Sequence, residues 1–462
     1  MTKVLVIGLD CATPQHIFGE YLEYLPNIRK ILENGLHAKM RSSNPPITIP
    51  AWLVMATSRN PGALGLYGFR HRKNYSYTDI WIANSYEVRK PAVWDILSDH
   101  GKKCIIIGVP PSYPPKPLNG YLITDFITPG PENEYTYPPE LKSEIQEKFG
   151  DYIFDVEFRT DKKRELSENL YKMVENHFEI IKYMLKNKPW DLFWFVEIGT
   201  DRVNHGFWHF ADKNHKKYQK GSGYENFIKD FHVYIDREIG ELLKLIDKET
   251  IVLMVSDHGA KAMKGRFSVN DWLINNNYLT LNSRPPPKTT LRDADINWSK
   301  TKAWGWGGYY ARIFLNVKER EELGTIDMKD YEKERDILIE KIKNIKDPSG
   351  NPMKMKVFKV EDIFPEQKGN APDLMVYFDD LSWRSAGTIG HDSPYLEENG
   401  LGPDEAVHDY FGIFAMYDPQ KKVGKNISEV NILDVAPTIL NLFNILIPEE
   451  MEGQIIRIEA YK

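Results

Sequence analysis

The sequence contains only two cysteines, Cys11 and Cys104, among 462 residues. Two cysteines can form neither a cysteine-rich zinc site nor a disulfide framework, so a reducing compartment fits this chain best. No stretch approaches the run of about eighteen apolar residues that a membrane span requires. The opening segment, MTKVLVIGLD, is too short an apolar stretch for a secretory signal. These absences favour a cytoplasmic protein without a membrane span.

The chain also lacks an excess of basic charge, a long run of like charge and an internal repeat. Its formal net charge is −6 at pH 7. Nucleic-acid phosphates attract basic surfaces, so this balance argues against nucleic acid as the main partner. Hydrophobic residues make up 42% of the chain and charged residues 27%, which is typical of a globular protein. The length allows one large α/β domain with insertions, or two or three ordinary domains.

Short apolar runs bounded by turn residues recur along the chain and predict buried strands. Longer stretches between them, with apolar residues three and four positions apart, predict helices. Alternating strands and helices indicate an α/β fold with a mostly parallel sheet sandwiched by helices. The expected strands are Val4–Leu9, Cys104–Val109, Leu192–Val196, Ile251–Val255, Leu374–Phe378 and Gly412–Met416, and the expected helices are Glu20–Asn34, Leu166–Asn187, Tyr224–Asp247 and Met328–Ile345.

Two regions have the composition of insertions. Residues 282–302 are polar and rich in proline, which predicts a loop or lid, and residues 325–347 predict a charged helix on the surface. We therefore expect a core built from residues 1–261 and 373–462, with an inserted cap or lid over residues 262–372.

Acidic and imidazole side chains follow several of the expected strands. Asp10 ends the first run, and Asp257 and His258 follow the run that ends at Val255. Asp201 and His205 follow a third run, and their spacing of four places them on one face of a helix. Ligands of such sheets bind beyond the carboxyl ends of the strands, where these side chains would gather. Together these side chains favour a Zn²⁺ or Mn²⁺ site. Taken singly, each of these residues or pairs is more often a solvated helix face, a turn or a helix cap.

Thr48 stands between two prolines in the segment NPPITIP, which confines its backbone and excludes the middle of a helix. The following residues, Ala51–Ala56, predict the start of a helix. The Thr48 hydroxyl is therefore either a helix N-cap or a nucleophile whose pKa is lowered by a metal ion and the helix dipole.

The order of these segments resembles the alkaline phosphatase superfamily, and within it the type I phosphodiesterase/nucleotide pyrophosphatase branch. The resemblance extends from Val4 to about Glu452 and includes the segment ILDVAPTIL at residues 432–440. It implies an alkaline-phosphatase-like core that holds two divalent metal ions, usually zinc. By similarity, one ion takes Asp201, His205 and a later histidine, and the other takes Asp10, Asp257, His258 and the oxygen of Thr48.

Two histidines are candidates for the later ligand. The family pattern places this histidine four residues before a glycine and an apolar strand. His408 fits that pattern, because Gly412 begins the run GIFAM. His391 does not fit it, and the alternative for His391 is a loop histidine. We therefore expect His408 to be the ligand.

The resemblance implies hydrolysis of a phosphoester by in-line attack of Thr48 on phosphorus. The expected substrate is a small phosphodiester such as a nucleotide or nucleotide-sugar. A phosphomonoesterase, phosphonate hydrolase or phosphomutase on the same scaffold is the alternative, as is a phosphoester-binding protein without turnover. A sulfatase is disfavoured, because that branch modifies a Cys or Ser and Thr48 cannot be modified in that way. The sequence leaves the oligomeric state open.

The chain departs from its relatives near the nucleophile. Ala51 and Trp52 stand where many relatives place an asparagine that holds a phosphate oxygen, and Leu64 stands where a histidine is expected. We expect substitute donors from three side chains or from backbone N–H groups beyond Thr48. These side chains are Arg70, His71 and Lys264.

Aromatic residues in the segment WGWGGYY provide a second set of candidate contacts. Trp304 and Trp306 would stack on a base or sugar if they are exposed to a ligand. Packing within a core or strand is the alternative interpretation for both rings, and the sequence favours it.

Overall fold

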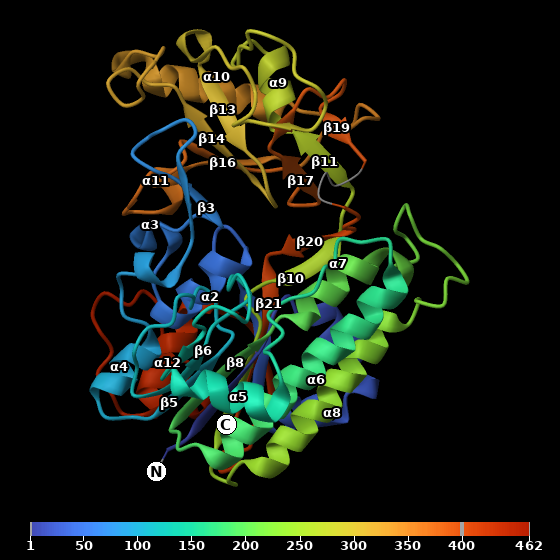
Figure 1. The fold of residues 1–462 in the computed structure, drawn as a ribbon, viewed down its shortest axis with the longest axis vertical. Helices are drawn as coiled ribbons and strands as arrows, with labels where there is room; N and C mark the ends of the chain where they lie inside the picture. Colours follow the sequence, from blue (N-terminus) through green and yellow to red (C-terminus); the bar gives the residue numbers. More distant parts are fainter. Residues whose placement is uncertain (1, 398–401, 462) are drawn as a thin grey trace. The chain divides into compact units, whose positions relative to one another are not determined.

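The computed structural model describes residues 2–397 and 402–461, and the chain divides into two compact units (Figure 1). Unit 1 comprises Met1–Leu64, Ala83–Ala260 and His408–Lys462, and unit 2 comprises Gly65–Ile82 and Lys261–Val407. The expected insertion, residues 262–372, therefore lies inside a larger unit. Unit 2 also takes in a short early segment and the residues up to Val407.

Unit 1 is built around a nine-stranded sheet with the order β22-β2-β21-β9-β1-β8-β5-β6-β7. The five strands from β9 to β6 run parallel, and β21 pairs with β9 in the antiparallel direction. The expected mostly parallel sheet is thus confirmed. The strands are β1 (Val4–Leu9), β2 (Leu36–Arg41), β5 (Cys104–Ile107), β6 (Gly120–Ile123), β7 (Thr136–Tyr137), β8 (Leu192–Glu197), β9 (Ile251–Val255), β21 (Phe411–Tyr417) and β22 (Lys425–Asn431).

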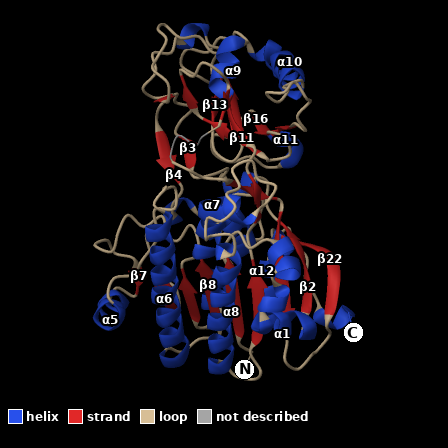
Figure 2. Ribbon diagram, turned by 90° about the vertical axis from the view of Figure 1, so that its right-hand side faces the viewer, coloured by secondary structure: helices blue, strands red, loops and turns tan. Residues whose placement is uncertain are grey.

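Helices cover both faces of this sheet, and in Figure 2 α1, α6 and α8 lie in front of the strands. The first layer contains α1 (Pro26–Asn34), α6 (Lys163–Asn187), α7 (Gly199–Ala211) and α8 (Phe227–Leu245). The second layer contains α2 (Thr48–Thr57), α4 (Val93–Asp99) and α12 (Val435–Leu442). The remaining helices of unit 1 are α3 (Pro61–Leu64) and α5 (Glu140–Phe149).

Both faces of the central strands are buried, because alternate side chains of one strand pack against opposite helical layers. In β8, the Phe195 ring packs at 5.8 Å from Phe178 of α6. The neighbouring Trp194 points the other way and lies 6.5 Å from the Trp52 ring of α2. This double burial explains why the strands appear in the sequence as continuous apolar runs.

The first expected helix is shorter than its sequence pattern. It was expected from Glu20, but α1 begins at Pro26 and is preceded by a π turn over His16–Glu20 and a 3₁₀ turn over Leu22–Tyr24. Proline lacks an N–H and is tolerated in the first turn of a helix but not in its middle. Pro26 therefore sets the helix start.

Unit 2 contains several small sheets around its own hydrophobic core. Its four-stranded antiparallel sheet has the order β13-β14-β16-β15, so the expected strand at Leu374 belongs here and not to the central sheet. The sheets comprise β13 (Ala303–Trp306), β14 (Ala311–Leu315), β15 (Lys356–Lys359) and β16 (Leu374–Tyr377), then β11 (Gly265–Ser268), β17 (Trp383–Ala386) and β19 (Tyr395–Leu396), and the pairs β3 (Arg70–Arg72) with β4 (Ile80–Ile82) and β12 (Thr289–Thr290) with β18 (Thr388–Ile389).

The helices of unit 2 are α9 (Val269–Asn275), α10 (Tyr331–Lys343) and α11 (Val360–Ile363). The expected surface helix corresponds to α10, but one of its faces is buried because Leu338 and Ile342 belong to the core of the unit. Strands β10 (Gly259–Ala262) and β20 (Ala406–Asp409) pair with each other. Each contains a boundary between the two units, one after Ala260 and the other after Val407. Among the described residues, no helix has the length and apolar character of a membrane span.

Candidate metal centre

The polar residues that follow the strands of unit 1 lie at one edge of its sheet. Asp10 directly follows β1, and Asp257 and His258 follow the adjacent parallel strand β9. On the other side of β1, strand β8 ends at Glu197 and leads into α7, which carries Asp201 in its first turn. Neighbouring parallel strands bring their carboxyl ends to the same edge, so segments far apart in sequence deliver these side chains together.

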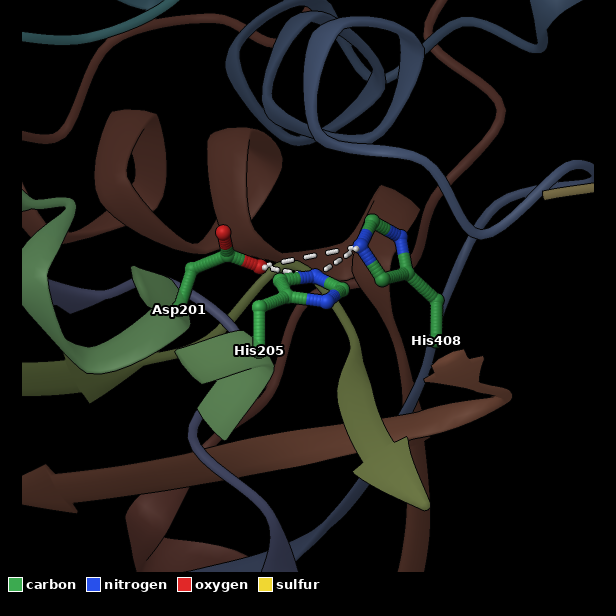
Figure 3. Close-up of side chains that lie close together, drawn as sticks. All are labelled: Asp201, His205 and His408. Atoms are coloured by element: carbon green, nitrogen blue, oxygen red, sulfur yellow. Dashed lines mark hydrogen bonds and ion pairs between the residues drawn. The ribbon is translucent and has the colours of Figure 1, made fainter. Parts of the chain in front are cut away.

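Asp201, His205 and His408 form one group of candidate metal ligands, and Figure 3 shows their polar atoms pointing toward one another. Asp201 Oδ1 lies 3.2 Å from His205 Nε2 and 3.6 Å from His408 Nε2. The two Nε2 atoms are 3.3 Å apart. His408 Nδ1 lies 3.0 Å from the carbonyl oxygen of Pro46, which can only accept, so Nδ1 carries the proton. The His408 Nε2 lone pair is therefore available to a metal.

Asp10, Asp257 and His258 form the second group. His258 Nε2 lies 3.1 Å from Asp257 Oδ2 and 3.8 Å from Asp10 Oδ1. His258 Nδ1 donates to the carbonyl oxygen of Gly259 at 3.1 Å, which again leaves Nε2 as the atom with the lone pair. The two groups are stacked on each other through His258 and His408, whose ring centroids are 3.6 Å apart.

Thr48 is the first residue of α2 and lies beside the second group. Its Oγ1 is 3.2 Å from His258 Nε2, and the residue is only 3% exposed. Ile47 is the N-cap residue, so Thr48 does not have the N-cap position that was the alternative interpretation. Its hydroxyl instead points to the imidazole and carboxylate cluster, close to the positive end of the helix dipole.

The pKa values of the three ligand carboxyl groups are shifted in different directions. Burial and repulsion from Asp201 raise the pKa of Asp10, and burial and repulsion from Asp10 raise that of Asp257. Burial also opposes ionisation of Asp201, but His205 and Arg202 outweigh it and hold the pKa of Asp201 well below its usual value.

The two imidazoles whose tautomers are fixed are neutral at physiological pH. Burial lowers the pKa of His408 to about 4, although Asp201 opposes this shift. Burial and the adjacent His408 ring lower the pKa of His258 well below its usual value. Neutral imidazoles are the form that binds a metal, so no proton has to leave these rings.

A divalent cation fits both groups. Asp10 Oδ1, Asp201 Oδ1 and Asp257 Oδ2 are buried, and none of them accepts a hydrogen bond from the described residues. Buried carboxylate oxygens without partners are costly, and a cation removes that cost. Two imidazoles with one carboxylate suit Zn²⁺, and two carboxylates with one imidazole accept Zn²⁺ or the harder Mn²⁺.

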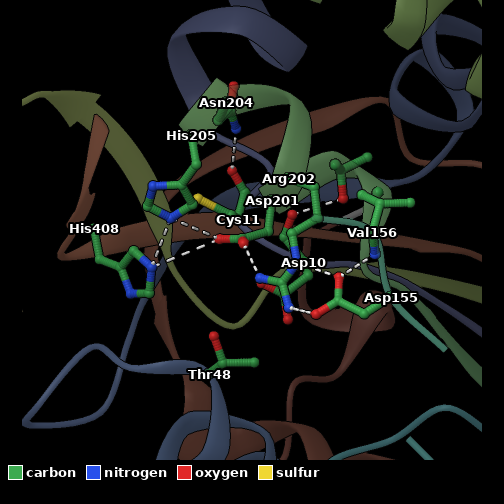
Figure 4. Close-up of polar contacts among 12 residues, drawn as sticks. Asp10, Cys11, Thr48, Asp155, Val156, Asp201, Arg202, Asn204, His205 and His408 are labelled. Atoms are coloured by element: carbon green, nitrogen blue, oxygen red, sulfur yellow. Dashed lines mark hydrogen bonds and ion pairs between the residues drawn. The ribbon is translucent and has the colours of Figure 1, made fainter. Parts of the chain in front are cut away.

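A buried arginine holds the other oxygen of Asp201. Arg202 Nη1 donates to Asp201 Oδ2 at 2.5 Å, while its Nε and Nη2 bind the two oxygens of Asp155 at 2.7 Å each (Figure 4). The guanidinium also lies over the Phe158 ring at 4.6 Å. This arrangement occupies one Asp201 oxygen and leaves Oδ1 directed toward His205.

Other side chains orient the second group. Trp52 Nε1 donates to Asp10 Oδ2 at 2.7 Å, and the backbone N–H of Cys11 donates to Asp257 Oδ1 at 3.2 Å. The sequence contains a signal for Trp52, because it lies four residues after Thr48 and so shares its helix face. It contains no signal for Asp155, which lies 47 residues before Arg202 and contacts it only through the tertiary structure.

Glu197 fixes the start of the helix that carries Asp201. Its Oε1 accepts the backbone N–H of Gly199 at 2.8 Å, and its Oε2 lies 3.0 Å from His177 Nδ1. The other ring nitrogen of His177 lies 2.6 Å from the carbonyl oxygen of Ile153. Both nitrogens therefore face acceptors, and Glu197 raises the pKa of His177 although burial opposes this.

The other residues expected from the sequence lie in unit 2. His391 belongs to neither candidate group, and its Nε2 lies 3.0 Å from Thr388 Oγ1. Lys264 forms an ion pair with Asp379 at 2.7 Å. Arg70 is exposed in β3, and the adjacent His71 is buried.

The two tryptophans differ from each other. Trp304 is fully buried in the hydrophobic core of unit 2, where its ring centroid lies 5.6 Å from that of Phe314. Its ring is therefore a packing element without an exposed face, which is the interpretation that the sequence favours. Trp306 is partly exposed, and Arg312 lies over its ring at 5.1 Å.

Comparisons with known proteins agree with the fold and the order of the motifs. The family model for type I phosphodiesterase/nucleotide pyrophosphatase matches residues 4–410. The chain belongs to this family, within the alkaline phosphatase superfamily. No curated protein matches the sequence.

Solved structures with the same fold include two mammalian ectonucleotide pyrophosphatase/phosphodiesterases. Murine ectonucleotide pyrophosphatase/phosphodiesterase 5, as an inactive threonine-to-alanine variant in complex with AMP, aligns with a TM-score of 0.58 and 14% identity, covering 98% of each chain. The human protein 5 aligns with a TM-score of 0.57 and 14% identity, covering 96% of each chain. At this identity the likeness establishes the fold.

Proposed function

We propose that this chain is a two-metal phosphodiesterase of the nucleotide pyrophosphatase type with Thr48 as its nucleophile. The observation that supports it most is the convergence of six acidic and imidazole side chains, in two groups, beside a helix-terminal hydroxyl. Membership of the phosphodiesterase and pyrophosphatase family supports the same reaction class.

Two divalent ions, proposed as Zn²⁺ with Mn²⁺ as the alternative, would lower the pKa of the Thr48 hydroxyl and neutralise phosphate oxygens when bound. Asp201, His205 and His408 would hold one of them. Asp10, Asp257, His258 and the Thr48 oxygen would hold the other.

The residues of the chain then have distinct roles. Thr48 Oγ1 attacks phosphorus in line with the leaving oxygen, so that a P–O bond forms to threonine as the bond to the leaving group breaks. Water subsequently cleaves the phosphothreonine and restores the hydroxyl. Because Thr48 opens α2, the positive end of the helix faces the developing negative charge. His408, held by Pro46, and Asp10, held by Trp52, keep their orientation throughout.

The proposed substrate class is a nucleotide or nucleotide-sugar with a diester or diphosphate linkage. Binding of AMP by the murine neighbour supports a nucleotide, and the family supports the type of bond.

The test compares bis-p-nitrophenyl phosphate, p-nitrophenyl phosphate and a panel of nucleotide-sugars with the zinc-loaded and the manganese-loaded protein. We expect diester or diphosphate hydrolysis to exceed monoester hydrolysis. A preference for the monoester would favour a phosphomonoesterase, and hydrolysis of no phosphoester in either metal form would favour a binding protein.

Thr48→Ala tests the nucleophile. We expect turnover to fall by about 10³-fold or more while two metal ions per chain are retained. Thr57→Ala is the matched control, because Thr57 is buried in the same helix and its Oγ1 donates to the Leu53 carbonyl oxygen at 2.7 Å. Full activity of Thr48→Ala would refute the assignment.

A further inference from the structure

Unit 2 contains a buried arginine whose charge is not balanced. Arg312 lies in β14, is only 7% exposed, and has no carboxylate within ion-pair distance among the described residues. Other buried arginines of the same unit differ from it. Arg72 pairs with Glu321 at 3.1 Å, and Arg384 pairs with Asp404.

The contacts of Arg312 are neutral ones. Its Nη1 donates to the backbone carbonyl of Arg70 at 2.5 Å, and its guanidinium lies over the Trp306 ring, its cross-strand neighbour, at 5.1 Å. An aromatic face and one carbonyl compensate a buried cation only in part, because they carry no net negative charge. Burial accordingly lowers the pKa of Arg312, and the nearby Arg70 lowers it further.

A buried donor without a partner stands next to Arg70 in the same strand. His71 is 4% exposed, and its Nε2 accepts the backbone N–H of Tyr67 at 2.9 Å. The proton of the neutral ring is therefore on Nδ1, and this N–H has no hydrogen-bond partner among the described residues. The ring is fixed by stacking on Trp81, with centroids 4.3 Å apart. Arg312 lies near this imidazole, because its Nη1 donates to the carbonyl oxygen of Arg70, the residue that precedes His71.

We propose that Arg312 and His71 form a binding site in unit 2 for an oxyanion, a phosphate or carboxylate group, with the exposed Arg70 as the outer positive charge. An oxyanion supplies the missing counter-charge to the guanidinium and an acceptor for the orphaned imidazole N–H. Phosphate matches best, since it carries up to two negative charges and several acceptor oxygens. Trp306, partly exposed beside Arg312, provides an aromatic face for a group attached to the anion.

The existence of this site does not depend on the function proposed above. The oxyanion has two possible sources, a second charged group of the substrate or a separate small anion, and only the first of these depends on that function. Kinetics with substrates of different charge distinguish the two sources.

The experiment uses the full-length metal-loaded protein and calorimetric titration with inorganic phosphate. We expect one binding step from the metal centre and a second from unit 2. Arg312→Gln should weaken the second step by about tenfold or more, since it removes a charge-assisted contact. Arg312→Lys, which keeps the charge, should restore part of it. Arg284→Gln is the matched control, because that arginine is exposed in unit 2.

His71→Met provides a second variant if Arg312→Gln fails to fold. Methionine has no N–H donor and keeps only a weak sulfur acceptor for the Tyr67 N–H, so the second step should weaken by several-fold. The site is refuted if both variants fold and bind phosphate with the stoichiometry and affinity of the wild-type protein.

The kinetic arm identifies the source of the anion. If Arg312→Gln lowers kcat/KM for diphosphate-linked nucleotide-sugars but not for bis-p-nitrophenyl phosphate, the anion is part of the substrate. If Arg312→Gln removes the second phosphate-binding step and leaves kcat/KM unchanged for both substrates, the anion is a separate ligand. If no substrate is hydrolysed by the wild-type protein, the proposed function fails, while the titration still decides whether the oxyanion site exists.

Discussion

Replacement of Arg202 by methionine tests how the ligand Asp201 is held. Methionine keeps part of the apolar stem beside Phe158 but removes the guanidinium that donates to Asp201 Oδ2 at 2.5 Å. Breaking a buried ion pair by removing one partner typically costs about 3–5 kcal/mol. Because Asp201 is 1% exposed, water cannot replace the lost donor, and the full range applies.

Two effects on metal affinity oppose each other in this variant. Loss of a positive charge removes repulsion toward a dication, but Asp155 already balances that charge through two bonds of 2.7 Å. Loss of orientation and a higher pKa of Asp201 act in the other direction, and nothing offsets them. We therefore expect zinc affinity to fall by about 10–100-fold, the usual effect of removing a partner that orients a ligand.

Competition with a chromophoric chelator measures this affinity. Asp155→Asn should also weaken zinc binding, since it leaves the guanidinium charge unbalanced, and the double variant should bind no worse than Arg202→Met. Arg202→Lys keeps the charge without the planar fork and should lie between the two. Zinc affinity of Arg202→Met within about twofold of wild type would refute the reasoning.

Three further predictions concern stability. Gly8→Ala should lower the free energy of unfolding by about 1–3 kcal/mol, as measured by urea denaturation. The added Cβ would lie 2.7 Å from the Phe195 carbonyl oxygen and 2.8 Å from the Trp52 ring. An unchanged denaturation midpoint would contradict this prediction. The pKa of buried His232 is lowered from 6.5 to about 4, so the unfolded chain takes up this proton first, and stability falls by roughly 3 kcal/mol as the pH drops from 6.5 to 4. His232→Asn should remove that part of the pH dependence, and an unchanged slope would assign it elsewhere. Zinc at about 1,000 times its Kd should increase the free energy of unfolding by about 4 kcal/mol. Asp257→Asn should reduce this increase, as measured by thermal unfolding with and without zinc. An equal increase in the variant would place the ion elsewhere.

Much of the central sheet could be predicted from the sequence. The strands β1 and β9 coincide with their apolar runs, because strands buried on both faces need continuous apolar residues. Pairing partners could not be predicted in the same way. The run at Leu374 resembles those of the central sheet but pairs with β14 and β15 in unit 2, since local composition does not specify which edge a strand joins.

The extent of unit 2 could not be predicted from the sequence for a similar reason. Residues 65–82 precede the rest of that unit by 178 residues and belong to it through contacts such as the Arg72–Glu321 ion pair. The positions of Asp10, Asp257 and His258 and of the pair Asp201 and His205 could be singled out because strand ends and helix spacing are local features. The division into two groups and the choice of His408 followed from the resemblance to the family. The side chains that orient the ligands, such as Asp155, depend on the tertiary structure alone.

The two ligand groups differ in the charge that a cation would meet. Asp201 accepts a hydrogen bond from Arg202 at its Oδ2, so a permanent positive charge already lies beside that carboxylate. Asp10 and Asp257 lie in one group with a single imidazole, and burial together with repulsion from Asp10 raises the pKa of Asp257. A cation in that group would therefore relieve the repulsion between two buried carboxyl groups, whereas a cation beside Asp201 would add to a positive charge that is already present.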